Sequence, residues 1–328
     1  MNPVDFGLRA SFVRESGKQI AMLQIQKKFL CGSYPPLLTP FRDGKVDFKK
    51  FAELTERQVR EGSHGVLVCG TTGEPSSLTV EERTELLKVA LQVTAKRIPV
   101  VAATGSQSLA ETLELTKRAE HAGADALLIV TPYYCKPSQR GLVEYFATVA
   151  ERTALPFMIY HIPGRTAVTV TVATVARIAE RAPNLVGIKH AANDLEFVTK
   201  LILSLGSEFR IFCGLEALSL PMLAVGAKGL MNAVSNLAPM RVASLYDAVA
   251  ADDLPTARKL HDELFELNES IFLDTNPIPL KYMMNRLGLL DSPELRLPLI
   301  SLDPQQAPML DAVLDRAGLL QTAGSRAS

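Results

Sequence analysis

The sequence predicts an α/β protein, a (β/α)8 TIM barrel followed by a helical C-terminal region. Two observations support this fold class: eight short apolar runs recur along the chain, and amphipathic segments separate most of them. Runs that are apolar on both faces and alternate with helices are typical of parallel strands covered on both sides. Eight such units within about 220 residues fit a closed barrel. The eight runs are residues 35–38, 65–69, 99–103, 126–130, 156–160, 185–188, 210–213 and 229–231.

The segments between these runs carry apolar residues at helical spacing. Two of them begin with the signature of a capping box, Thr79 with Glu82 and Ser108 with Glu111. The competing fold, a doubly wound open sheet, usually carries a glycine-rich phosphate-binding loop after its first strand. Residues 34–44 contain no such loop, so the barrel is favoured. The clearest helical segments are residues 48–59, 81–93 and 110–122.

The chain divides into three regions by pattern. Residues 1–32 are interpreted as an N-terminal extension and a candidate for disorder, because they carry mixed charge and no core pattern. The stretch 20–30 is too interrupted by Gln and Lys for a secretory signal, and Met22 is an alternative start. Residues 33–237 are the predicted catalytic barrel, and residues 238–328 a helical region packed on it. The helices expected there are residues 241–249, 254–271 and 308–317.

The composition argues against several classes of function. Lys plus Arg and Asp plus Glu both number 35 in the 328 residues, so no net basic field is available to attract nucleic acid. The longest apolar runs are about five residues, too short for a membrane span. The four cysteines are far apart, which indicates reduced thiols in a cytoplasmic protein. Because no group of Cys, His or carboxylate residues has metal-ligand spacing, we expect no metal site.

Lys189 is the most unusual residue of the pattern, because it directly follows the buried run 185–188. Lysine is rarely buried without a partner. At the end of a buried strand its ammonium loses hydration, so its pKa should fall and the free amine becomes available as a nucleophile. A lysine that simply reaches solvent from the strand end is the alternative. The neighbouring strand ends are therefore needed to decide between the two.

Polar residues gather where a barrel places its active site, just past the carboxyl ends of the strands. The second run is followed by a turn of sequence GTTGE, residues 70–74, and the fourth by TPYY, residues 131–134. Tyr160 ends the fifth run, and Arg165 follows it closely. A desolvated lysine, proton-carrying hydroxyls, an anion-binding turn and an arginine are what imine chemistry on a small keto acid requires. Spacing alone leaves an unrelated barrel as an alternative.

These motifs together resemble the dihydrodipicolinate synthase/N-acetylneuraminate lyase family. The resemblance runs in order from about residue 33 to Leu320. It implies a (β/α)8 barrel with a helical C-terminal region and class I aldolase chemistry on pyruvate, with no metal or organic cofactor. It also implies a homotetramer, a dimer of dimers. The motifs that carry it are residues 70–74, 131–134, 160–166 (YHIPGRT), 187–189 (GIK) and 276–281 (NPIPLK).

Each family role is transferred only to a residue that matches its motif. Lys189 matches the lysine that forms the imine, and Tyr160 matches the tyrosine that relays protons. Thr72 and Tyr134 match the other members of the relay, with Tyr134 expected to cross from a neighbouring subunit. The resemblance places pyruvate's carboxylate at Thr71 and Thr72, with the main chain of Met231 in contact.

Arg165 favours the synthase branch, whose arginine meets the carboxylate of aspartate semialdehyde at the pocket mouth. The reaction expected is condensation of pyruvate with L-aspartate-4-semialdehyde to 4-hydroxy-tetrahydrodipicolinate, in lysine and diaminopimelate biosynthesis. A sister lyase or hydratase acting on a sugar-derived 2-keto-3-deoxy acid is the alternative, and a catalytically silent small-molecule-binding barrel is a third. His190 and residues 191–194 depart from the synthase pattern. We expect them to face the second substrate, so they leave its identity open.

The resemblance also covers the site at which lysine inhibits some synthases. Glu111 and Tyr133 match that site. Loss of its other polar groups should cost about 1 kcal/mol or more per contact. We therefore expect weak or no inhibition by lysine. The departures are Pro75, Val80, Arg83 and Gln107, where inhibited enzymes have Ser, His, His and Asn.

Overall fold

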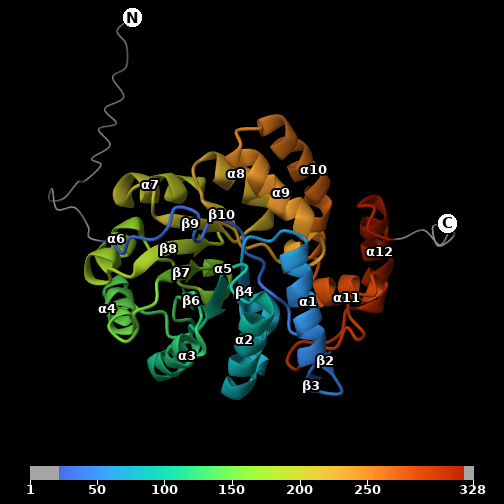
Figure 1. The fold of residues 1–328 in the computed structure, drawn as a ribbon, viewed down its shortest axis with the longest axis horizontal. Coiled ribbons are helices and arrows are strands. Elements are labelled where there is room, and N and C mark those ends of the chain that lie inside the picture. Colours follow the sequence, from blue (N-terminus) through green and yellow to red (C-terminus); the bar gives the residue numbers. More distant parts are fainter. Residues whose placement is uncertain (1–21, 321–328) are drawn as a thin grey trace, which may run out of the picture.

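The structure, a computed structural model, describes residues 22–320, and in it eight parallel strands form a barrel surrounded by helices (Figure 1). The strands follow one another around the barrel in chain order. A parallel bridge between Pro36 and Leu67 joins the first strand segment to the second and closes the ring. The predicted TIM barrel is therefore confirmed. Its strands are β1 (Gly32–Ser33), β4 (Val66–Val68), β5 (Val100–Ala103), β6 (Ala126–Val130), β7 (Phe157–His161), β8 (Leu185–His190), β9 (Arg210–Cys213) and β10 (Gly229–Leu230).

The first strand differs from its prediction. The sequence predicts it at residues 35–38, whereas the regular strand is β1, three residues earlier. Pro35 and Pro36 have no backbone N–H, so this stretch cannot form a full ladder with β4. The Leu37 N–H donates to the Leu67 carbonyl, and the Leu67 N–H donates to the Pro35 carbonyl. These two bonds keep residues 35–37 beside β4 without a regular strand.

Helices cover the outside of the barrel, and a small hairpin lies beside the first of them. The capping box predicted at Thr79 and Glu82 is present at the start of α2. The one predicted at Ser108 is only half formed: its hydroxyl accepts from the Glu111 N–H, but the Glu111 carboxylate accepts from Ser106 instead. The elements are β2 (Phe41–Arg42), β3 (Lys45–Val46), α1 (Phe48–Arg60), α2 (Val80–Thr94), α3 (Leu109–Ala122), α4 (Gln139–Ala150), α5 (Pro163–Thr166), α6 (Val172–Arg181), α7 (Leu195–Leu205) and α8 (Ser219–Ala224).

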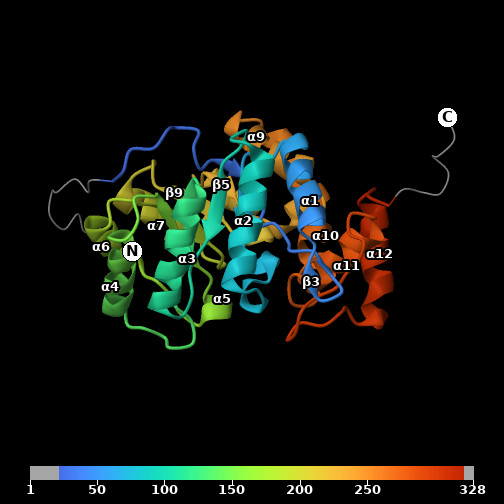
Figure 2. The same cartoon turned by 60° about the horizontal axis from the view of Figure 1, so that its bottom comes forward.

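The helical C-terminal region begins later than the sequence predicts. Helix α9 (Pro239–Ala250) packs against β1 and β10, so it is the eighth helix of the barrel rather than part of an added region. The predicted boundary at residue 237 thus falls between a barrel strand and its own helix. Three further helices complete the described chain: α10 packs on α9, whereas α11 and α12 lie to one side of the barrel, beyond α1 in both views (Figures 1 and 2). They are α10 (Leu254–Ser270), α11 (Ile278–Arg286) and α12 (Ala307–Arg316).

The alternation of side chains along the strands separates two apolar cores. One lies between the strands and the helices, and the smaller one fills the barrel, where Tyr34 and Phe212 meet edge to face. Leu30 belongs to this inner core although the sequence analysis places it in the extension. The buried Arg210 side chain donates to main-chain carbonyls of residues 26, 27 and 29, so residues 22–31 lie against the amino end of the barrel. The rest of the predicted extension, residues 1–21, lies outside the described part of the chain.

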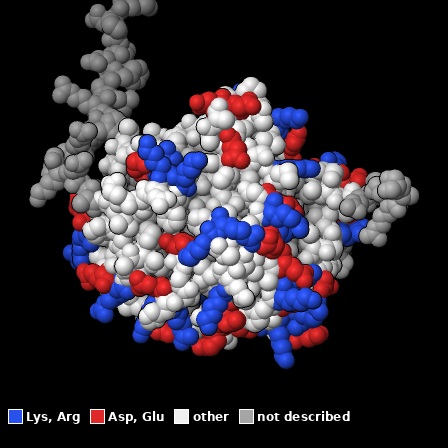
Figure 3. All heavy atoms as spheres, in the orientation of Figure 1, with Lys and Arg blue, Asp and Glu red and all other residues white. Residues whose placement is uncertain are grey.

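Acidic and basic side chains are interspersed on the face seen in Figure 3, so this face carries no large patch of one charge. Among residues 22–320, no helix is both long enough and apolar enough to span a membrane. Within the same residues, no three or more His, Cys, Asp or Glu side chains are grouped so that they could hold a metal ion.

Candidate active site

The carboxyl ends of the strands bring Lys189 into the barrel. Lys189 is the fifth residue of β8 and pairs in register with Tyr160 of β7. Its side chain is 3% exposed, and its Nζ lies 4.3 Å from the centroid of the Tyr160 ring. The Nζ therefore lies over the face of the ring, within the range of a cation–π contact. A Cβ on Gly214 would lie 2.6 Å from the Lys189 Cε, so glycine is needed there for the lysine to lie across the end of β9.

The turn after β4 presents two threonines to the same space. Residues 71–73 form one turn of 3-10 helix, which the Gly73 N–H closes by donating to the Gly70 carbonyl. The Thr71 hydroxyl lies 3.4 Å from the Tyr160 hydroxyl. The Thr72 hydroxyl instead accepts from the Asn276 Nδ2 at 3.1 Å. The geometry therefore places Thr71, and not Thr72, next to the tyrosine.

A pocket over these groups contains six of the seven residues predicted for the site. Its empty volume is about 330 Å³, including open solvent at the mouth. Arg165, at the end of short helix α5, is exposed at the mouth and donates to the Asn276 carbonyl at 3.3 Å. The side chain of Met231 is buried below. The predicted residues that line it are Thr71, Thr72, Tyr160, Arg165, Lys189 and Met231.

Tyr134 is the predicted residue that this chain does not bring to its own pocket. Its side chain is 88% exposed, and its backbone has φ +68°, a conformation uncommon outside glycine. A tyrosine displayed in this way from a strained loop is available to another chain. Because one chain is described, the predicted crossing into a neighbouring subunit stays a prediction.

Seven further residues line the pocket, and three of them have polar or aromatic side chains that the sequence did not predict for the site: Asn276, Phe272 and Glu216. Asn276 belongs to the NPIPLK motif, so its signal was present without an assigned partner. Glu216 is buried, and its Oε1 accepts from the Ala233 N–H at 2.6 Å. Burial raises the pKa of this carboxyl above its ordinary value, and the hydrogen bond from the Ala233 N–H and the nearby Lys189 oppose the rise only in part. No sequence pattern indicated that this acid, three residues after β9, turns into the pocket.

His190 does not face the second substrate, and the prediction that it does is wrong. Strand alternation turns it away from Lys189 to the outer side of the wall, where it is buried and stacks on Phe197 of α7 at 4.7 Å. Its Nδ1 lies 3.1 Å from the Nδ1 of His161. Burial lowers the pKa of His161 to about 4, so this histidine is neutral at physiological pH. The departure at position 190 therefore concerns packing outside the pocket, and it is no argument against an aldehyde substrate.

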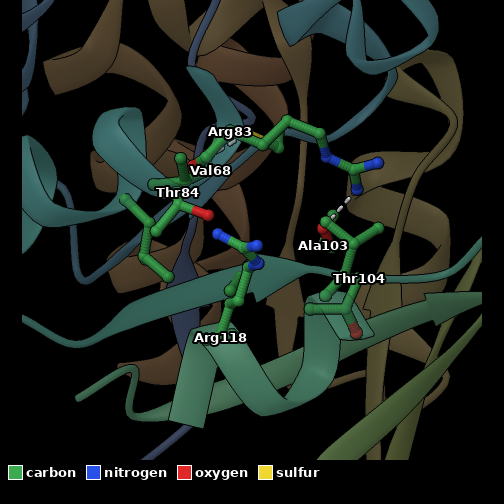
Figure 4. Close-up of a pocket in the computed structure, with 11 residues that line it drawn as sticks. Val68, Arg83, Thr84, Ala103, Thr104 and Arg118 are labelled. Carbon is green, nitrogen blue, oxygen red and sulfur yellow. Dashed lines mark hydrogen bonds between the residues drawn. The ribbon is translucent and has the colours of Figure 1, made fainter. Parts of the chain in front are cut away.

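A second cavity lies outside the barrel wall, between α2 and α3 (Figure 4). Arg83 and Arg118 reach into it from these helices, and an Arg83 Nη donates to the Ala103 carbonyl at 2.9 Å. The space left to water is about 20 Å³, enough for about one water molecule. Neither Lys189 nor Tyr160 contributes to it, so it is not the active site.

Comparison with known proteins agrees with this geometry. The model of the dihydrodipicolinate synthetase family matches residues 30–317. A 4-hydroxy-tetrahydrodipicolinate synthase of Thermus thermophilus is 48% identical over 290 residues, which are 88% of this chain and 97% of that protein. The crystal structure of the Aquifex aeolicus dihydrodipicolinate synthase superposes with a TM-score of 0.86 at 39% identity, covering 88% of this chain and 98% of that one.

A third relative has been crystallised with a keto acid. It is the chloride-inhibited dihydrodipicolinate synthase of Acinetobacter baumannii, complexed with pyruvate. It superposes with a TM-score of 0.86 at 37% identity, covering 89% of this chain and all of that one. The match therefore extends over nearly the whole described chain in each of these relatives.

Proposed function

Because this chain belongs to the dihydrodipicolinate synthetase family, we propose that it condenses pyruvate with L-aspartate-4-semialdehyde to 4-hydroxy-tetrahydrodipicolinate, in lysine and diaminopimelate biosynthesis. It is an enzyme, a lyase of the class I aldolase type, and its substrates are small molecules. The observation that carries the proposal is the buried Lys189, whose Nζ lies 4.3 Å from the Tyr160 ring at the base of a pocket. The relatives described above bear the synthase name, which favours the synthase over a sugar-acid lyase or a silent barrel.

Lys189 is the proposed nucleophile. Its neutral amine attacks C2 of pyruvate, the carbonyl oxygen takes up a proton, and loss of water from the carbinolamine leaves an imine. Loss of a proton from C3 gives an enamine. Its C3 attacks the aldehyde carbon of the second substrate, the aldehyde oxygen takes up a proton to become a hydroxyl, and the imine at C2 is restored. The amino group of that substrate then attacks the imine carbon, closes the ring and releases Lys189 as an amine. The chain's own groups suffice for these steps, so we propose no cofactor.

Tyr160 and Thr71 are proposed to carry the protons. Their hydroxyls are 3.4 Å apart, close enough to tighten into a hydrogen bond when substrate is bound. We assign this role to Thr71 in place of Thr72, because the Thr72 hydroxyl is bound to Asn276. Thr71 and Thr72 also open the 3-10 turn, where backbone N–H groups have no acceptor within the turn, and these groups are proposed to hold the pyruvate carboxylate beside Met231.

Arg165 is proposed to bind the carboxylate of the aldehyde substrate at the pocket mouth. A hydrogen bond to a charged group contributes about 1.5–3 kcal/mol. We therefore expect Arg165→Ala to raise the KM for the aldehyde roughly 10- to 100-fold, with the KM for pyruvate changed less than about twofold. Steady-state kinetics with each substrate varied in turn measures both. Arg181→Ala, which removes a surface arginine paired with Glu144 on the outer helices, is the control. Equal effects of Arg165→Ala on both KM values would make its role structural.

The proposed reaction is tested by direct turnover. Pyruvate and L-aspartate-4-semialdehyde are supplied together, and product formation is coupled to dihydrodipicolinate reductase and followed by loss of NADPH. We expect a kcat/KM of about 10⁴ M⁻¹s⁻¹ or higher, the range of working enzymes. A protein that traps pyruvate with borohydride but gives no turnover would keep the lysine chemistry and point to a 2-keto-3-deoxy acid instead. A protein that traps no pyruvate would point to the silent barrel.

Inhibition by lysine is predicted to be weak or absent, and Arg83 supports this prediction. An Arg83 Nη lies 4.0 Å from the Glu111 carboxylate, so a cation already faces the acid that an effector lysine would need. We expect an inhibition constant well above about 1 mM at saturating pyruvate, because the lost contacts cost about 1 kcal/mol or more each. A lysine-sensitive synthase assayed in parallel is the control. A constant at or below about 1 mM would contradict the prediction.

We also propose that the working enzyme is a cytoplasmic homotetramer, a dimer of dimers. The exposure of Tyr134 supports an assembly in which a neighbouring chain receives this side chain and completes its proton relay. Light scattering on the purified protein measures the mass of the assembly. A fully active monomer would contradict the role proposed for Tyr134.

A further inference from the structure

Glu74 and Lys281 form an ion pair that is closed off from water. The Lys281 Nζ lies 2.6 Å from the Glu74 Oε1, and the two side chains are 0% and 2% exposed. Glu74 is the last residue of the 70–74 turn, and Lys281 lies on α11 in the C-terminal region. The pair therefore joins two segments that are more than 200 residues apart in the sequence. The reaction steps described above use neither residue.

Each partner of the ion pair is held by further contacts. The Lys281 Nζ donates to the Glu294 carbonyl at 2.7 Å and lies 4.1 Å above the Phe41 ring. The Glu74 Oε2 accepts from the Arg296 N–H at 3.3 Å. The Arg296 guanidinium also lies over Phe41 and binds Glu82 at the start of α2. The carboxylate of Glu74 is thus fixed from two separate points of the C-terminal region.

Because Glu74 ends the 70–74 turn, contacts that hold its carboxylate also hold this turn. Glu74 has φ +53° and ψ +47°, a left-handed conformation that is unfavourable for a residue with a Cβ and persists only where the surroundings hold it. In this conformation its N–H donates to the Thr71 carbonyl and closes the turn that carries Thr71 and Thr72. Asn276, five residues before Lys281, binds the Thr72 hydroxyl of the same turn. One C-terminal segment therefore contacts the substrate-facing turn twice.

Stability alone does not explain why charges occupy this place. Taking two charges out of water carries a desolvation cost that can exceed their mutual attraction, and apolar replacements of a buried pair are often neutral or stabilising. Burial lowers the pKa of Lys281 to about 8 and raises that of Glu74, while each partner opposes the shift of the other. An ion pair has one advantage over an apolar contact here, since it fixes the direction of the side chain as well as its burial.

We infer that Glu74 and Lys281 are positioning residues: their ion pair holds the 70–74 turn so that Thr71 and Thr72 face Lys189 and Tyr160. This inference rests on the proposed function, in which that turn binds the pyruvate carboxylate. The pair then acts chiefly on the capture of pyruvate, because Glu74 is part of the turn itself, whereas Arg165 lies on α5 and contacts the C-terminal segment through one hydrogen bond to the Asn276 carbonyl.

The test separates positioning from folding by comparing single and double variants. Glu74→Gln and Lys281→Met each leave one partner buried without its counter-charge, and the double variant Glu74→Met/Lys281→Met removes both charges. For each protein we measure the Tm, and the pyruvate concentration that gives half-maximal borohydride trapping. The trapping readout does not depend on the identity of the aldehyde. In variants that turn over, the KM of the aldehyde is measured as well.

We expect the pyruvate concentration for half-maximal trapping to rise at least roughly tenfold in both single variants. A displacement of about 1 Å in a positioning group can lower a reaction rate about 10²-fold. The aldehyde KM should change less than about twofold. The double variant should recover Tm towards that of the unaltered protein, yet keep the raised pyruvate requirement. A structural role would restore both together. Arg210→Met is the matched control, since it removes a buried cation bound to backbone carbonyls at the opposite end of the barrel. It should lower Tm without changing the pyruvate requirement.

Several results would overturn the inference. Folded single variants that trap pyruvate at the normal concentration would remove any positioning role. A double variant that recovers both Tm and pyruvate capture, or that does not fold, would assign the pair to folding alone. An unaltered protein that traps no pyruvate would overturn this inference together with the proposed function. If the unaltered protein traps pyruvate and the variants trap it at the same concentration, this inference is contradicted and the proposed function stands.

Discussion

Replacing Lys189 with alanine is expected to abolish turnover, with kcat lowered by at least about 10⁴-fold, the scale seen when a catalytic nucleophile is removed. Without the ε-amine no imine can form, so pyruvate is never activated at C3. Loss of the amine also removes the covalent bond that holds pyruvate while the second substrate reacts. Intact mass after incubation with pyruvate and borohydride measures this directly. The unaltered chain should gain one reduced adduct, and the variant none.

Two controls limit the interpretation of this result. Lys200→Ala removes a surface lysine that forms an ion pair with Glu196 on α7, and it should keep both adduct and turnover. Thermal unfolding of Lys189→Ala should show a folded protein, since the removed side chain lines the pocket beside an aromatic ring and is not part of the apolar core. A full adduct on Lys189→Ala would assign the nucleophile to another lysine.

The parts of this site that follow from local pattern were predictable from the sequence. Parallel strands place their carboxyl ends at one rim, so Tyr160 and Lys189 could be brought together without knowledge of the coordinates. Their pairing in register across β7 and β8 agrees with that expectation. Side chains along a strand alternate between its two faces, so His190 must point outward if Lys189 points inward. This alternation contradicts the expectation that His190 faces the second substrate.

Contacts over long sequence separations were not predictable. Two such contacts join segments more than 200 residues apart: the hydrogen bond from Asn276 to Thr72 and the ion pair of Glu74 with Lys281. The spacing of apolar residues carries no information about contacts of this kind. The choice between Thr71 and Thr72 depends on the orientation of a single 3-10 turn. The helical segment after residue 237 was visible, but whether α9 covers the barrel depends on its packing against β1 and β10.

Tyr160→Phe is expected to lower kcat by about 10²- to 10⁴-fold, the usual contribution of a positioned general acid or base. The change removes only the hydroxyl. The ring below the Lys189 ammonium remains, so the lysine should keep its place 4.3 Å from the ring centroid. The amine is then still present, but the carbinolamine oxygen has lost the Tyr160 hydroxyl, which supplies the proton with which this oxygen leaves as water. Borohydride trapping should therefore still reach completion, at a rate lowered by a similar factor.

A comparison of two tyrosines separates this role from general effects of losing a buried hydroxyl. Tyr34 lies in the same inner core, and its hydroxyl accepts from the Leu30 N–H at the other end of the barrel. Tyr34→Phe should lower stability by about 1 kcal/mol, the typical contribution of one hydrogen bond, while kcat stays within about twofold. If Tyr160→Phe behaves like Tyr34→Phe, the proton must reach the carbinolamine oxygen by another route, and the Thr71 hydroxyl would be the next group to remove. If only Tyr160→Phe slows both trapping and turnover, the hydroxyl acts in imine formation itself, because trapping requires no second substrate.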